Sequence, residues 1–248
     1  MSVDRLDRAA ATAAWTSAVL RGTTSIDQAH DVLHSLTPRL VFVPHDDVTP
    51  LSLPFAVARW RSMNVAGWQY VPVAPGDLNG LPGPASFSSV ALDCGVALVA
   101  LSSAGGQAPA LGLVPDDPDD PATWRELTTD RPARCDETTA SDAERAMLEA
   151  LNRTVAVVEE HDLAHWGADL HDVRASWTES IPAPPDTSGR SERLIERSRR
   201  VLEIVAAAKA DDGGSRTLGE MQVRQMAASY WFNEVLILAL FASVRPLG

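Results

Sequence analysis

Small and apolar residues recur at the three- and four-residue spacing of an amphipathic helix over residues 4–20. A second helix is predicted to begin at Ser25, because Gln28 follows three residues later and completes a capping box. This helix is expected to end near Leu36, before Pro38. The pattern therefore predicts that the chain opens with a pair of helices.

The middle of the chain changes to short β-branched and apolar runs bounded by glycine and proline, which are typical of strands. The runs 96–101 and 110–114 flank a glycine-rich segment and predict a hairpin. Short helices are predicted at 55–62 and 86–94. The run 124–128 is expected to add an edge strand. The other predicted strands are 40–43 and 68–73.

From Ser141 the pattern is helical to the end of the chain, with Glu144 completing a capping box at its start. The proline-rich segment 181–189 interrupts it and predicts a hinge or linker. These elements predict an α+β fold with an N-terminal helical pair, a central sheet of about four or five short strands and a helical C-terminal region. We divide the chain into a mixed region, 1–135, and a helical region, 136–248, which form one domain or two.

The composition of the 248-residue chain is that of a folded protein, with 45% hydrophobic and 22% charged residues. The 21 basic and 33 acidic residues give a net charge of −12, which disfavours binding to nucleic acid or to an anionic membrane surface. The N-terminus lacks the apolar core of a signal peptide, and the longest apolar run, Val235–Val244, is too short to span a bilayer. Cys94 and Cys135 are predicted to be reduced thiols. We therefore expect a soluble cytoplasmic protein.

The helix expected at 190–210 has an apolar seam on one side and arginines on the other. Such a face is either a solvated helix surface or a docking face for an acidic partner. We expect Arg193, Arg197 and Arg200 to contact a partner. The five arginines of this face are Arg190, Arg193, Arg197, Arg199 and Arg200.

The turn-rich loop 75–86 follows a predicted strand and carries Asp77 and Asn79, which we expect to contribute to partner binding. Three aromatic residues lie upstream of this loop. They are expected either in the core or lining a pocket or a peptide-binding surface. These residues are Trp60, Trp68 and Tyr70.

Polar residues interrupt the apolar face of the helix predicted over 141–177. Asp162, His165 and Asp169 recur at helical spacing there, with His161 further out. Buried carboxylates need a counter-charge. One hypothesis is a site for a divalent metal such as zinc or manganese. The alternatives are an ion pair with an arginine, or an open polar pocket.

A second histidine pair, His30 and His34, is four residues apart on the predicted second helix. Two histidines at this spacing suit a metal. The metalloprotease pattern requires a glutamate after the first histidine, whereas Asp31 stands there. We expect the pair to join a metal site only if its helix packs against the long helix predicted over 141–177.

The sequence contains no G-x-S-x-G elbow, no P-loop and no G-x-G-x-x-G after a strand. The leading hypothesis is therefore a non-catalytic regulatory or scaffold protein that binds a protein partner or a second copy of itself, without a cofactor. An alternative is a metal-dependent hydrolase, in which the metal lowers the pKa of a bound water. A further alternative is a small-molecule sensor with a polar pocket.

Overall fold

The structure is a computed structural model, and the residues that it describes form two compact units. The first unit extends to Asp130 and includes 182–188. The second contains the described residues between 141 and 152 and the helix from Gly189. The predicted boundary at residue 135 lies outside the described residues. These are 3–73, 81–102, 110–118, 120–130, 141–142, 144–145, 147–149, 152 and 182–210, with the backbone alone for 3–6 and 201–210.

The chain opens with the predicted pair of helices, α1 (Val3–Arg21) and α2 (Ile26–Leu36). Ser25 caps α2, since its Oγ accepts a hydrogen bond from the backbone N–H of Gln28 at 3.1 Å. The side chain of Gln28 instead accepts a hydrogen bond from the Thr24 hydroxyl at 2.9 Å. The predicted start and end of this helix are therefore confirmed.

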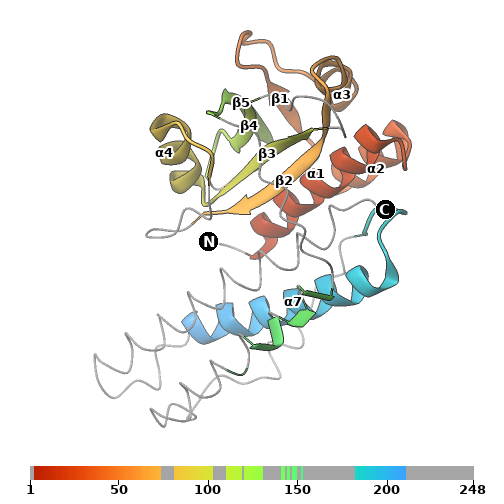
Figure 1. Ribbon diagram of the computed structural model, residues 1–248, viewed down its shortest axis with the longest axis vertical. Coiled ribbons are helices and arrows are strands. Elements are labelled where there is room, and N and C mark those ends of the chain that lie inside the picture. The colour runs from red at the N-terminus through yellow and green to blue at the C-terminus, as the bar shows by residue number, and fades with distance from the viewer. Residues whose placement is uncertain are drawn as a thin grey trace. The chain divides into compact units, whose positions relative to one another are not determined.

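The first unit is built on a five-stranded mixed sheet with the order β1-β5-β4-β3-β2, so the α+β fold is confirmed (Figure 1). β1 and β5 are parallel, and the other neighbours are antiparallel. The prediction that the run 124–128 forms an edge strand is wrong, because β5 lies between β1 and β4. The strands are β1 (Val41–Val43), β2 (Val65–Pro72), β3 (Val96–Ser102), β4 (Leu111–Pro115) and β5 (Thr123–Thr128).

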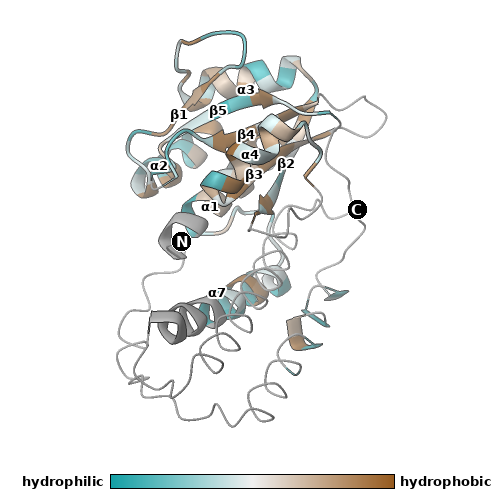
Figure 2. Ribbon diagram, turned by 90° about the vertical axis from the view of Figure 1, so that its left-hand side faces the viewer, coloured by the Kyte–Doolittle hydropathy of each residue, from teal (hydrophilic) through white to brown (hydrophobic). Residues whose placement is uncertain are grey.

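Helices cover both faces of this sheet, with α4 (Ala85–Cys94) on one face and α1 and α3 (Leu53–Ser62) on the other (Figure 1). The α4 helix ends at Gly95, whose φ of 71° is the left-handed conformation that glycine adopts readily. A cluster of apolar side chains joins α4 to the sheet, and Figure 2 shows the apolar residues of the strands in brown. The cluster consists of Val71, Val73, Leu81, Phe87, Ala91, Ala97, Val99 and Val114.

The opposite face is filled by aromatic residues. The rings of Trp60 and Phe42 meet edge to face at 4.8 Å, and those of Trp60 and Trp68 at 4.9 Å. Both tryptophans are fully buried, and Tyr70 is 2% exposed. These aromatic residues belong to the core, so the alternative that they line a pocket or a peptide-binding surface is wrong.

α1 lies along β2 and closes that edge of the sheet. Its residues from Ala11 to Val19 are all buried, and most of them are alanine, serine or threonine. Small side chains let the helix approach the strand closely, since a Cβ added at Gly67 would lie 3.2 Å from the Ser17 Oγ. That oxygen accepts a hydrogen bond from the backbone N–H of Trp68 at 2.8 Å. A side chain of α1 thereby satisfies an edge-strand donor that would otherwise be buried without a partner.

We expect Ser17→Ala to lower the free energy of unfolding by about 1–2 kcal/mol. The substitution leaves the Trp68 N–H buried, while the higher helix propensity of alanine offsets a few tenths of a kcal/mol. Urea denaturation followed by circular dichroism measures the change. Ser35→Ala is the matched control, because the Ser35 side chain is exposed on α2. Equal stability of the two variants would contradict this role of Ser17.

The proline-rich segment that was predicted as a hinge or linker is held against α1. The indole N–H of Trp15 donates to the carbonyl of Pro182 at 2.8 Å. The Asp186 carboxylate accepts hydrogen bonds from Arg21 at 2.6 Å and from the Thr23 hydroxyl at 2.9 Å. Residues 182–188 are therefore an integral part of the first unit.

Among the described residues, no helix combines the length and the apolar character that crossing a bilayer requires. The run Val235–Val244 lies outside the described residues. The Cys94 side chain is buried, and its Sγ lies 3.1 Å from the carbonyl oxygen of Pro115. Cys135 lies outside the described residues.

Candidate functional site

The second unit contains α7 (Gly189–Ala210), which agrees with the helix predicted at 190–210. Its predicted seam is buried at Leu194 and Ser198. The Ser198 hydroxyl lies 3.4 Å from the sulfur of Met147, a buried residue among the helical residues described between 141 and 152. The seam of α7 thus packs against these residues and leaves the arginine-bearing side of the helix outward.

The arginines predicted as partner contacts do share an exposed face of α7. Arg193, Arg197 and Arg200 are all exposed, and the side chain of Arg197 is 55% exposed. Arg200 pairs with Glu196, one turn earlier on the same helix. Arg193 makes no ion pair with any residue in the described part of the chain.

Glu144 is the acidic residue that faces these arginines. Its Oε2 accepts hydrogen bonds from Arg190 Nη2 at 2.8 Å and Nε at 3.2 Å, and its Oε1 lies 3.7 Å from Arg197 Nη1. The hydrogen bond from Arg190 lowers the pKa of the Glu144 carboxyl below its usual range, and the neighbouring arginine charges act in the same direction. The Glu144 carboxylate, which was expected to complete a capping box with Ser141, thus accepts hydrogen bonds from an arginine of α7.

These side chains surround a hollow of about 330 Å³, which we call the arginine hollow. Among the described side chains that line it, three arginines face one glutamate, which is an excess of two positive charges. Guanidinium groups bind carboxylates through paired N–H donors, so the arrangement suits an anionic group of a partner. The hollow is lined by Glu144, Arg190, Arg193, Leu194 and Arg197.

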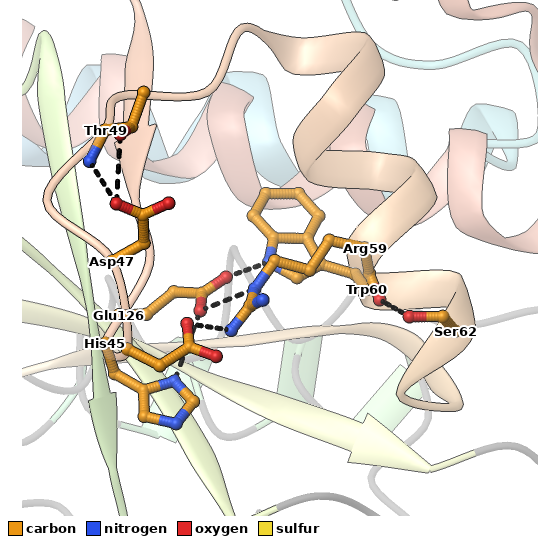
Figure 3. A network of polar contacts seen from close by, with 8 residues as sticks. His45, Asp47, Thr49, Arg59, Trp60, Ser62 and Glu126 are labelled. Carbon is orange, nitrogen blue, oxygen red and sulfur yellow. Dashed lines mark hydrogen bonds and ion pairs between the residues drawn. The ribbon is translucent and has the colours of Figure 1, made fainter.

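A second polar cluster lies in the first unit around Glu126 of β5 (Figure 3). The Glu126 side chain is 1% exposed. Its Oε1 accepts a hydrogen bond from the indole N–H of Trp60 at 2.7 Å, and its Oε2 accepts one from Arg59 Nε at 3.2 Å. A buried carboxylate is thus matched by a charged and a neutral donor from α3, as burial of a charge requires.

This cluster also holds the chain that follows β1. Arg59 Nη2 donates to Asp46 at 2.6 Å, and His45 Nδ1 lies 3.5 Å from the Glu126 carboxylate. Burial lowers the pKa of the Arg59 guanidinium, but the charges and hydrogen bonds of Glu126 and Asp46 outweigh this effect and raise it. Further along, Asp47 accepts hydrogen bonds from the backbone and hydroxyl of Thr49 (Figure 3). We interpret the cluster as a structural clamp between the sheet, α3 and this loop.

Glu126 was not predicted as a buried residue, although the alternation of inward and outward positions along β5 indicates that it is one. Trp124 and Glu126 are two residues apart in β5 and therefore point to the same face of the sheet. Since Trp124 is fully buried, the carboxylate shares an inward face. A charged residue at an inward position of a strand implies a buried counter-charge, and Arg59 supplies it.

Most of the residues predicted to bind a metal, and the residues of the loop 75–86 predicted to bind a partner, lie outside the described residues. These assignments stay predictions. His30 and His34 are the exception. They stack on the exposed side of α2 with ring centroids 5.5 Å apart. Over the part of the chain that the structure describes, no three histidine, cysteine or acidic side chains gather as metal ligands. The predicted site residues that lie outside the described part of the chain are Asp77, Asn79, His161, Asp162, His165 and Asp169.

Two domain models of one family match consecutive parts of the chain. Residues 9–141 match the Rv1486c-like protein, N-terminal domain, and residues 141–228 match the Rv1486c-like protein, C-terminal domain. Comparisons with curated proteins and with solved structures gave no match. The two family matches meet at Ser141, ahead of the glutamate that faces the arginine hollow. The chain therefore belongs to the Rv1486c-like protein family.

Proposed function

We propose that this protein is a non-catalytic regulatory or scaffold protein of the cytoplasm that binds an acidic segment of a protein partner. The contact surface is the arginine face of α7. The single observation that carries the proposal is the arginine hollow, in which three guanidinium groups face one carboxylate. A partner that supplies further carboxylates completes this charge arrangement.

The chemistry of arginine supports a protein contact at this face. Arginine is enriched at protein interfaces, where its planar group forms paired hydrogen bonds with carboxylates. The chain as a whole carries a net charge of −12, so a locally positive hollow contrasts with its surroundings. An acidic partner is attracted to that hollow and repelled elsewhere, which favours one orientation of binding.

The two alternative functions rest on different residues. A metal-dependent hydrolase requires the histidines and aspartates predicted between 161 and 169, which lie outside the described residues. A small-molecule sensor requires a polar pocket there. Partner binding is preferred because its predicted contacts, Arg193 and Arg197, share a described hollow.

Charge reversal at the hollow tests the proposal. We expect Arg193→Glu/Arg197→Glu to reduce capture of the partner in a crosslinked pull-down at least about tenfold, because each substitution replaces an attraction with a repulsion. The matched control, Arg39→Glu/Arg125→Glu, changes the net charge equally at exposed positions of the first unit. Unchanged capture by the hollow variant, or equal loss in both variants, would refute binding at this face.

A further inference from the structure

The arginines of the hollow differ in the hydrogen bonds and ion pairs that they make with described residues. Arg190 gives two hydrogen bonds to one oxygen of Glu144, whereas the other oxygen lies 3.7 Å from Arg197, beyond hydrogen-bond length. Arg193 lies between these two on the helix and makes no ion pair with any described residue. One carboxylate thus occupies a site that has guanidinium donors for at least two.

The contact made by Glu144 is also easily exchanged. Its side chain is 33% exposed, and those of Arg190 and Arg197 are 53% and 55% exposed. Ion pairs at such exposure change an equilibrium by a factor of roughly two to five, because water solvates the separated charges well. A carboxylate from outside the chain can therefore replace Glu144 at small cost.

We propose that Glu144 is an internal competitor of the partner, and that the partner binds by placing its own carboxylates where Glu144 now lies. The partner segment then presents at least two carboxylates on one face. One takes the place of Glu144 at Arg190, and the other binds Arg193 and Arg197. This inference rests on the proposed function, since it specifies what the same hollow recognises.

The spacing of the arginines indicates the form of that segment. Arg190, Arg193 and Arg197 are separated by three and four residues, so they form one stripe about two helical turns long. Acidic residues at the same spacing on a helix present a parallel stripe of carboxylates. A synthetic helical peptide with glutamates three and four residues apart is therefore a suitable probe.

The experiment titrates this labelled peptide with the full chain at low ionic strength and follows fluorescence anisotropy. We expect Glu144→Gln to bind it roughly two- to fivefold more tightly than the unmodified protein, because the competitor is removed. Glu149→Gln is the matched control. It removes the same charge from an exposed side chain that pairs with Arg145 away from the hollow, and its affinity is expected to stay unchanged.

The outcomes separate this inference from the proposed function. If Glu144→Gln binds no more tightly than Glu149→Gln while Arg193→Glu/Arg197→Glu abolishes binding, Glu144 is not a competitor and the hollow is still the binding site. If the arginine substitutions also leave binding unchanged, the proposed function fails as well. Weaker binding by Glu144→Gln, with unchanged circular dichroism, would show that Glu144 supports the site and would overturn the inference.

Discussion

Glu126→Ala is expected to lower the free energy of unfolding of the protein by about 3 kcal/mol, the largest effect that we predict. Removing one partner of a buried charge pair costs about 3–5 kcal/mol, because the other partner is left uncompensated. Here the lower end applies, since Arg59 is 24% exposed and keeps its contact with Asp46. The indole N–H of Trp60, by contrast, is left fully buried without an acceptor.

Urea denaturation of three variants tests the clamp. Glu126→Gln is expected to fall between Glu126→Ala and the unmodified protein, because the amide oxygen still accepts from Trp60 but no longer carries the charge that faces Arg59. Asp31→Ala removes a carboxylate whose side chain is 86% exposed and is expected to have almost no effect. A loss below about 1 kcal/mol for Glu126→Ala would show that the cluster does not stabilise the fold.

Gly112→Ala is expected to destabilise the protein by about 1–3 kcal/mol through overpacking. A Cβ at this position of β4 would lie 2.5 Å from one ring carbon of Phe87 and 2.6 Å from another. The ring cannot move away easily, because Phe87 is 1% exposed within the core between α4 and the sheet. Thr129, with a methyl group 3.2 Å from the added atom, limits relaxation on the other side.

A double-mutant cycle with Phe87→Leu distinguishes overpacking from a general loss of stability. The smaller leucine leaves space for the added methyl group, so the double variant is expected to be more stable than the sum of the two single changes predicts. Thermal denaturation monitored by circular dichroism gives the three values. Strict additivity would contradict the close approach of Gly112 to Phe87.

The helices and strands of the first unit could be predicted because their signals are local. The capping pair at Ser25, the left-handed end at Gly95 and the apolar runs of β2 and β3 each depend on a few neighbouring residues. The position of β5 could not be predicted in this way. Its parallel pairing with β1 joins residues far apart in the chain, and no short-range pattern specifies such a partner.

The same difference between local and long-range signals applies to the candidate site. The arginine face of α7 was predictable from helical spacing, because that periodicity lies within one element. The pairing of Glu144 with those arginines was not predictable. Glu144 was assigned to its own helix start, whereas in the structure its carboxylate reaches Arg190 of α7, near the contact of Met147 with Ser198. Glu126 was missed for a similar reason, since its counter-charge comes from a different element.

A single binding measurement shows whether the arginine hollow binds carboxylates. Fluorescence anisotropy of the labelled acidic peptide would be measured with the unmodified chain, with Arg193→Glu/Arg197→Glu and with the control Arg39→Glu/Arg125→Glu. We predict binding by the unmodified chain and by the control, weakened by salt, and no measurable binding by the hollow variant. Equal binding by all three proteins, or binding by none of them, would contradict the binding of an acidic partner in the arginine hollow.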